Sequence, residues 1–270
     1  MYKQRMKYWP AYTWKIQTSY SSDIKDSVVS EFKMSAVELK KIYFNIFDKI
    51  NASFYHLECL RGNEEIAVQI GRELAGVKIP GTKDMVGIVG SPYEPIGYEY
   101  EAFLTTIKSA LDFIAMLLAK GLDKSEDNII SLVNRMRTDN ADSSTLEGQI
   151  YSLLNAQKIK TFIDGYKGNR PGFKSKRNYA IHDGSLPVGT INIPINNQRV
   201  SPTLSKALDP NSPNSHASLL RSQNLIEFCD NQFYQTCNIL IKILSLITNT
   251  QLTPGPMSSV YDQTVKKAGE

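Results

Sequence analysis

The sequence is poor in the residues that build disulfide frameworks and metal sites. It holds only three cysteines and three histidines among 270 residues. Three is an odd and sparse number for a disulfide scaffold, and a structural zinc ion takes about four ligands. Only His56 and Cys59 stand three residues apart, and no second pair has suitable spacing, so we interpret both as exposed side chains rather than ligands. We therefore expect reduced thiols, no metal and no cofactor.

Long apolar runs are also scarce. Residues Met1–Lys7 are aromatic and polar where a secretory leader carries its apolar segment. The most apolar stretch, Cys237–Ile247, is interrupted by Lys242 and falls short of the roughly 20 apolar residues that a membrane span takes. We expect a cytoplasmic protein without a membrane segment, in which Cys229 and Cys237 act as small hydrophobic side chains of the core.

Helical periodicity dominates the rest of the sequence. Four segments carry apolar residues at intervals of three and four, the spacing that places side chains on one face of an α-helix. Amphipathic helices of this length bury their apolar faces most economically against one another. We predict an all-α fold, an up-and-down helical bundle. The four predicted helices cover approximately residues 30–60, 99–119, 144–166 and 215–248.

Less regular segments lie between and beyond these helices. A short helix is predicted over Glu64–Leu74. An extended, β-like excursion is predicted over Val188–Ile195, within residues 184–214 and before the last helix. We expect three parts in the chain: a basic, aromatic N-terminal arm (1–25), a single helical domain (26–250) and a flexible tail (251–270).

Two polar motifs carry less weight. Residues Gly76–Lys83 have the glycine spacing of a phosphate-binding loop, but the lysine and threonine stand in reversed order and a proline interrupts the loop. On the second helix, Ser109 and Asp112 could form a buried polar pair. A helical wheel places Asp112 opposite the apolar stripe, so we interpret it as a solvated surface carboxylate.

The modest net charge of +4 hides a concentrated basic segment. Gln157–Arg177 holds seven basic residues and one acid, a net of +6, and residues 1–15 add four basic residues and no acid. Tyr166 and Phe173 interleave with the basic residues, which is typical of surfaces that contact phosphates and stack bases. The alternative is a solvated loop whose aromatic side chains face the core. The candidate RNA-binding residues are Lys167, Arg170, Lys174 and Lys176.

Arg177, Asn178 and His182 follow this segment directly. RNA cleavage without a metal needs a base for the 2′-hydroxyl proton and an acid for the 5′-oxygen leaving group, and histidine exchanges protons near neutral pH. A guanidinium suits the extra negative charge of the transition state. Asn178 lies four residues before His182, on the same helical face, where it could orient the imidazole or hold a phosphate oxygen. The ordinary alternative is that Arg177 pairs with an acid and His182 caps a helix.

This combination resembles the HEPN superfamily of small helical domains. The signature of that superfamily is an arginine, a polar residue, three to five further residues and a histidine beside the last helices of the bundle. The resemblance covers roughly residues 99–250. It implies a metal-independent endoribonuclease with Arg177 and His182 as catalytic residues and Asn178 in support. Active members work as dimers whose motifs face one another across a cleft, and many serve as toxins or in phage defence.

Helix geometry gives a separate reason to expect a homodimer. Positions five apart on an α-helix lie about 140° apart around its axis, so Arg177 and His182 do not point at one place. A two-fold axis would bring the arginine of one chain near the histidine of the other, although a long arginine side chain could also bend round. Two other interpretations stay open. One is a non-catalytic HEPN-fold module that binds RNA, a nucleotide or a protein such as a cognate antitoxin, and the other is a structural helical dimer with an acidic partner.

Overall fold

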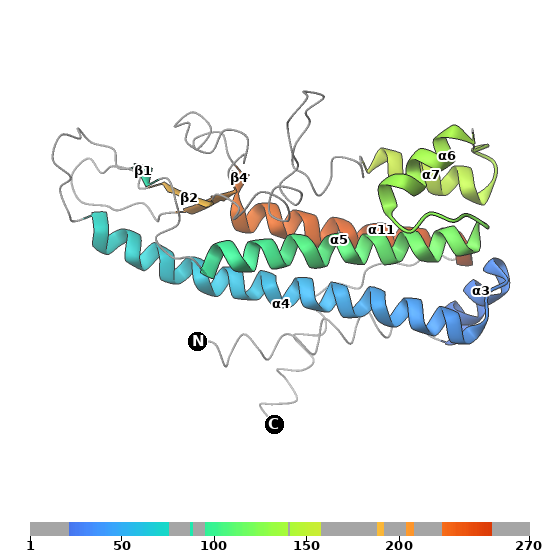
Figure 1. The fold of residues 1–270 in the computed structure, drawn as a ribbon, viewed down its shortest axis with the longest axis horizontal. Coiled ribbons are helices and arrows are strands. Elements are labelled where there is room, and N and C mark those ends of the chain that lie inside the picture. The colour runs from blue at the N-terminus through green and yellow to red at the C-terminus, as the bar shows by residue number, and fades with distance from the viewer. Residues whose placement is uncertain are drawn as a thin grey trace. The chain divides into compact units, whose positions relative to one another are not determined.

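Helices dominate the part of the chain that the structure describes, which confirms the predicted helical character (Figure 1). The structure is a computed structural model, and it describes residues 22–75, 87–88, 95–139, 141–157, 188–191, 204–207 and 223–249. The predicted arm up to residue 21 and the predicted tail lie outside these residues. The described helices are α3 (Ser22–Phe32), α4 (Ala36–Ala75), α5 (Pro95–Gly121), α6 (Ile129–Thr138), α7 (Leu146–Ala156) and α11 (Leu225–Thr248).

The predicted helix over residues 30–60 is wrong at both ends, because a helix boundary falls inside it. Lys33 adopts a positive φ of 48°, which ends α3. Ser35 and Glu38 then form a capping box: the Ser35 hydroxyl oxygen accepts a hydrogen bond from the Glu38 backbone N–H at 3.2 Å, and Ser35 donates to the Glu38 carboxylate. The helix that starts there continues to Ala75 and includes the separate short helix that we predicted.

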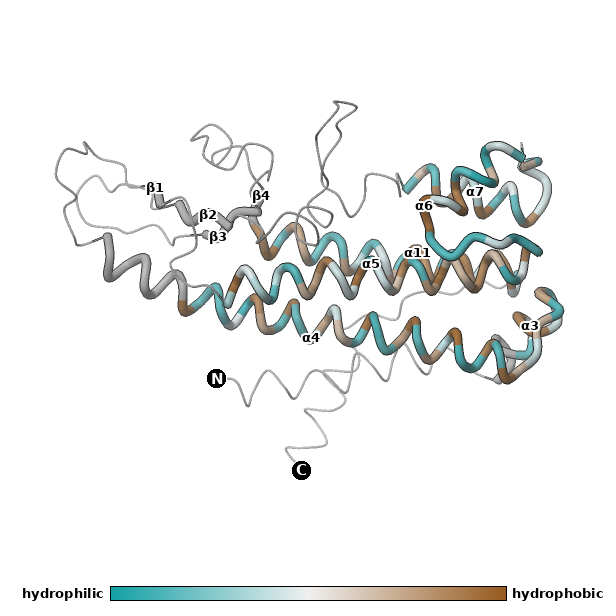
Figure 2. Tube along the Cα trace, viewed as in Figure 1, coloured by the Kyte–Doolittle hydropathy of each residue, from teal (hydrophilic) through white to brown (hydrophobic). Residues whose placement is uncertain are grey.

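Along its whole length, helix α5 is more apolar than α11, the helix that contains Cys237–Ile247. By length and composition alone it could cross a membrane, a test that buried core helices also pass. Its apolar residues are coloured brown along the tube of Figure 2, and Ile107 and Ile114 are fully buried. The helix begins at Pro95, where the missing N–H costs nothing. It ends at Gly121, where a Cβ would lie 2.2 Å from the ring of Phe32.

The chain divides into two compact units. Each of the helices α4, α5 and α11 has one part in the first unit and its other part in the second. The first unit comprises residues 1–52, 107–160 and 234–270. The second unit comprises residues 53–106 and 161–233. Each unit has its own buried apolar residues. They include Leu39, Ile46, Leu111, Ile150 and Leu240 in the first unit, and Leu57, Tyr100, Phe103, Phe228 and Phe233 in the second.

The first unit contains α6, a helix that the sequence analysis missed. Asn128 caps it by accepting a hydrogen bond from the Ser131 backbone N–H at 2.9 Å. Thr145 caps α7 in the same way through the N–H of Gly148, at 3.1 Å. Helices α6 and α7 pack against each other. The predicted third helix, 144–166, is α7 up to residue 156, and its remainder beyond residue 157 lies outside the described residues.

The second unit contains a small four-stranded antiparallel sheet with the strand order β1-β2-β3-β4. Strand β2 falls within the stretch predicted to be extended, and Val188 pairs with Ala207 of β3. Strand β4 occupies residues that were predicted to be helical, and α11 begins only at Leu225. Pairing with β3 holds β4 extended. The helical periodicity of the sequence gives no sign of this pairing, because it is a contact with a distant segment. The strands are β1 (Gly87–Ile88), β2 (Val188–Ile191), β3 (Leu204–Ala207) and β4 (Gln223–Asn224).

Candidate functional site

The seven predicted site residues belong to one stretch of chain between α7 and β2. This stretch, residues 158–187, lies outside the described residues, so the predicted RNA-cleaving site stays a prediction. The chain enters the stretch from the C-terminal end of α7 and leaves it into the first long strand of the sheet. The residues concerned are Lys167, Arg170, Lys174, Lys176, Arg177, Asn178 and His182.

A cluster of polar side chains in the second unit has the geometry of a candidate proton-transfer site. His56 on α4 and Glu99 on α5 lie 2.7 Å apart, Nδ1 to Oε2, and both side chains are about one quarter exposed. This is a hydrogen-bond distance, and it ties the imidazole ring of α4 to a carboxyl group of α5. The arrangement is that of sites in which a carboxyl group orients a histidine.

Tyr55 and Cys59 extend this cluster along α4. The ring of Tyr55 packs edge-on against the His56 ring, with the centroids 5.4 Å apart. A hydrogen bond to Cys59 is the main cause that raises the pKa of Tyr55 above its usual value. Cys59 itself is only 6% exposed. The interpretation of His56 and Cys59 as exposed side chains is therefore wrong, because Glu99 on α5 contacts His56 and Tyr55 on α4 contacts Cys59.

Arg61, also on α4, forms ion pairs with two acidic residues. Its guanidinium pairs with Glu58 on the same helix and with Asp230 on α11, so a single arginine links the two helices inside the second unit. Burial raises the pKa of Asp230 above its ordinary value, and the nearby Arg61 opposes that effect. The arginine therefore keeps a half-buried carboxylate in place, which is a positioning role.

Apart from its imidazole and its carboxyl groups, the cluster offers few reactive side chains. In the described part of the chain no group of three metal-ligating side chains is close enough to hold a metal ion. The one thiol of the cluster, Cys59, is buried and gives little access to a substrate. The sequence carried a partial signal for the cluster, since Glu58 and Arg61 stand three residues apart. It carried none for Glu99 or Asp230, which approach α4 only in the folded chain.

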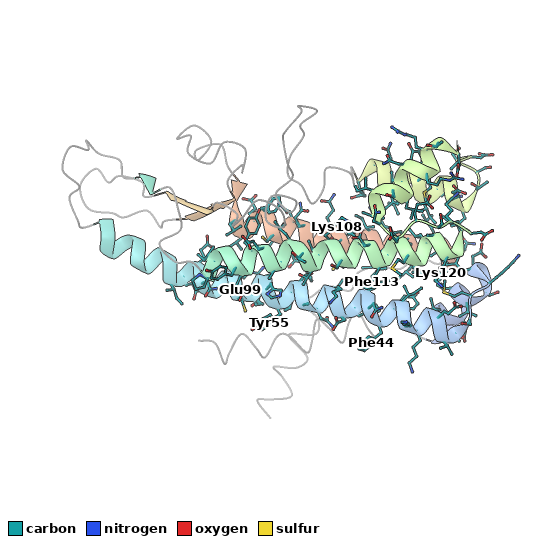
Figure 3. The ribbon with its side chains drawn as sticks, in the orientation of Figure 1. Phe44, Tyr55, Glu99, Lys108, Phe113 and Lys120 are labelled. Carbon is teal, nitrogen blue, oxygen red and sulfur yellow. The ribbon has the colours of Figure 1, made fainter. Side chains whose placement is uncertain are left out.

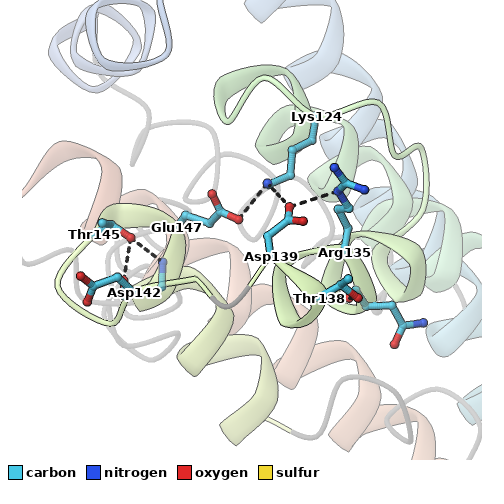
Figure 4. A network of polar contacts seen from close by, with 9 residues as sticks. Lys124, Arg135, Thr138, Asp139, Asp142, Thr145 and Glu147 are labelled. Carbon is cyan, nitrogen blue, oxygen red and sulfur yellow. Dashed lines mark hydrogen bonds and ion pairs between the residues drawn. The ribbon is translucent and has the colours of Figure 1, made fainter.

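A second polar network lies in the first unit and joins the loop after α5 to α6 and α7 (Figure 4). The ammonium of Lys124 lies 2.9 Å from Asp139 and 2.8 Å from Glu147, and its side chain is only 11% exposed. Arg135 adds a contact to Asp139 at 3.1 Å. Two cations and two acids balance in this network. Because its charged groups are paired with one another, we interpret the network as a structural link between α6 and α7 rather than as a reactive site.

Asp112 on α5 holds the beginning of α6, a role that the sequence did not predict. Its Oδ1 accepts a hydrogen bond from the backbone N–H of Ile129 at 3.2 Å and pairs with the ammonium of Lys108. The interpretation of Asp112 as a solvated surface carboxylate is therefore wrong. Its face of α5 lies against the beginning of α6, whose first N–H it satisfies.

Comparisons with models of protein families, with curated proteins and with solved structures find no match. The conclusions on function therefore rest on the residues of this chain. What the described residues establish is a mainly helical protein with a His56–Glu99 contact in one unit and an ion network that joins α6 and α7 in the other.

Proposed function

We propose that the protein is a cytoplasmic, metal-independent endoribonuclease of the HEPN type that works without a cofactor. The observation that carries the proposal is the order Arg177, Asn178, three residues and His182, directly after a segment with a net charge of +6. The helical character of the described residues supports it, as does the position of the motif in the chain between α7 and α11. A role as a toxin or in phage defence follows from the same resemblance.

In the proposed reaction the 2′-hydroxyl of one nucleotide attacks the adjacent phosphorus. His182 takes part in the proton transfers, and the guanidinium of Arg177 stabilises the negative charge of the phosphorane. Asn178 orients the imidazole or holds a phosphate oxygen. The bond from phosphorus to the 5′-oxygen breaks, and the products carry a 2′,3′-cyclic phosphate and a 5′-hydroxyl. The lysines and Arg170 of the basic segment bind the backbone on either side.

The proposal includes a homodimer in which the arginine of one chain approaches the histidine of the other. This arrangement would also supply two histidines, one to accept and one to donate a proton. Light scattering at micromolar concentration tests it, with a dimeric mass as the expected result. A monomeric mass would contradict the composite site.

The decisive experiment measures cleavage of structured and unstructured RNAs by the purified protein in EDTA. We expect products with 2′,3′-cyclic phosphate ends, and their loss in Arg177→Ala and His182→Ala. The matched control is Arg137→Ala, which removes an exposed arginine of α6. This control should cleave as the unmodified protein does.

Two other outcomes would change the conclusion. Salt-sensitive RNA binding without cleavage, unchanged in His182→Ala, would replace the proposal with a non-catalytic binding module. An absence of any RNA affinity at low salt would overturn an RNA-directed function altogether, because phosphate contacts are strongest under that condition.

A further inference from the structure

One face of α4 in the first unit presents an exposed aromatic ring between two lysines. Phe44, whose side chain is labelled in Figure 3, is 72% exposed, and Val37 is 79% exposed. Seven residues of an α-helix fall only about 20° short of two full turns, so these two side chains lie on one line along the helix, about 10 Å apart. These two apolar side chains form a short line along one exposed face of α4, within reach of a ligand.

The charges around this line are positive and uncompensated. Lys40 and Lys41 are both exposed, and among the described residues neither makes an ion pair. At 100° per residue they lie about 40° and 60° from Phe44, on opposite sides of it, one turn earlier. The apolar line therefore has a cation on each flank.

The neighbouring acids are already engaged by other groups. Glu38 pairs with Lys120 at 3.2 Å and with the hydroxyl of Ser35. Asp48 lies 3.3 Å from Lys49. These contacts leave Lys40 and Lys41 as the cations available to an anionic ligand on this face.

We propose that this face of α4, made of Val37, Lys40, Lys41 and Phe44, binds single-stranded RNA. An exposed ring stacks on a base whatever its identity, and flanking lysines contact the phosphates on either side of it. Val37 offers an apolar contact to the neighbouring nucleotide. The site shares its ligand class with the proposed function but needs no cleavage. It lies on a helix far in sequence from the basic segment at residues 157–177.

Fluorescence anisotropy with a labelled 12-residue oligouridylate tests this site in the full-length chain carrying His182→Ala, so that the RNA stays intact. We expect Phe44→Ala to weaken binding by roughly fivefold or more, the effect of one base that no longer stacks. Phe44→Tyr should retain most of the affinity. The double variant Lys40→Ala/Lys41→Ala should lower the slope of log Kd against log salt by about 1.4, because two phosphates are then no longer neutralised by the protein.

Tyr98→Ala is the matched control, because Tyr98 is 60% exposed but lies beside Glu99 and Glu101 rather than between lysines. It should bind as the parent does. Equal affinities for Phe44→Ala, Tyr98→Ala and the parent would overturn the proposal. So would binding of a glutamate-rich peptide, lost in Phe44→Ala, in place of oligouridylate, since the face would then serve a protein. Circular dichroism on all variants confirms that exposed substitutions leave the fold intact.

Different results would contradict the proposed nuclease function and the proposed RNA-binding face of α4. Cleavage by the His182-containing protein together with normal oligouridylate binding by Phe44→Ala would leave the nuclease function and remove this site. Phe44-dependent binding without cleavage in any condition would leave this site and remove the nuclease function.

Discussion

The imidazole of His56 meets the carboxylate of Glu99 at 2.7 Å and so joins α4 to α5 inside the second unit. Both side chains are about one quarter exposed, so the pair contributes at most about 1 kcal/mol to the free energy of unfolding. We expect Glu99→Ala to lose most of this and Glu99→Gln less, because the amide can still form a hydrogen bond with the imidazole ring. Urea unfolding of the single and double variants with His56→Ala measures the coupling. Additive losses in the double variant would show that the contact is absent in solution.

Asp112→Ala should loosen α6. The substitution removes the acceptor of the Ile129 N–H and the partner of Lys108, and we expect a loss of about 1–2 kcal/mol in the free energy of unfolding. Asp112→Asn keeps an oxygen acceptor and should lose less. Hydrogen exchange at the Ile129 amide gives a local readout, with the Leu132 amide of the same helix as its reference. Unchanged protection at Ile129 in the alanine variant would refute the capping role.

Gly148→Ala and Gly97→Ala should change stability in opposite directions. A Cβ at position 148 would lie 1.8 Å from the backbone oxygen of Asp142, so either α7 or the turn before it must move. We expect a loss of about 2–4 kcal/mol. Position 97, in the first turn of α5, has nothing within 4 Å, and alanine there should add about 0.5 kcal/mol through its better helix propensity. Calorimetry of both variants and the parent measures the two changes. Equal melting temperatures for Gly148→Ala and the parent would contradict the close approach at Gly148.

Tyr100→Phe should leave the protein as stable as before, or more stable by up to about 1 kcal/mol. The hydroxyl of Tyr100 is fully buried and has no hydrogen-bond partner among the described residues. Burial raises its pKa well above the usual value. Removing an unsatisfied polar group ends its desolvation cost, while the ring keeps its edge-on contact with Phe228. Urea unfolding measures the change, and a loss above 1 kcal/mol would show that the hydroxyl is bonded in solution.

The sequence predicted the long helices because burial on one face sets their periodicity. Helix α5 was placed to within a few residues at each end, since its stripe is continuous and Gly121 ends it. Helix α6 was missed because it has only 10 residues and because its first N–H is satisfied by Asp112, 17 residues earlier. A short helix that depends on a distant acceptor leaves a weak local signal.

The polar cluster of the second unit could be predicted only in part. A helical wheel of α4 by itself places Cys59 opposite the apolar stripe, yet it is buried. Arg61 and Asp230 are separated by 169 residues, and no local pattern joins them. Contacts between helices decide which polar residues meet, and a single sequence does not contain that information.

The Lys124 network should make stability depend on pH in a defined direction. A hydrogen bond from Lys124 holds the pKa of Asp139 below its usual value of 3.8, so the stability that it contributes is present above that value and is lost as acid protonates the folded protein. Partial burial favours the neutral amine of Lys124, but Glu147 and Asp139 outweigh it and raise the pKa of the ammonium, so its contribution is lost only when alkali titrates the folded protein.

Asp139→Asn should therefore be less stable than the parent at pH 7, and the difference should shrink as the pH falls below 3.8 and the carboxyl of the parent takes up its proton. Lys124→Gln should show the same trend, because the Asp139 carboxylate that the ammonium contacts loses its charge in acid. Urea unfolding at pH 7 and pH 2.5, on the parent and both variants, provides the comparison. A difference between Asp139→Asn and the parent that stays constant from pH 7 to pH 2.5 would mean that Asp139 contributes through its shape rather than its charge, and the ion network would then hold α6 and α7 by packing alone.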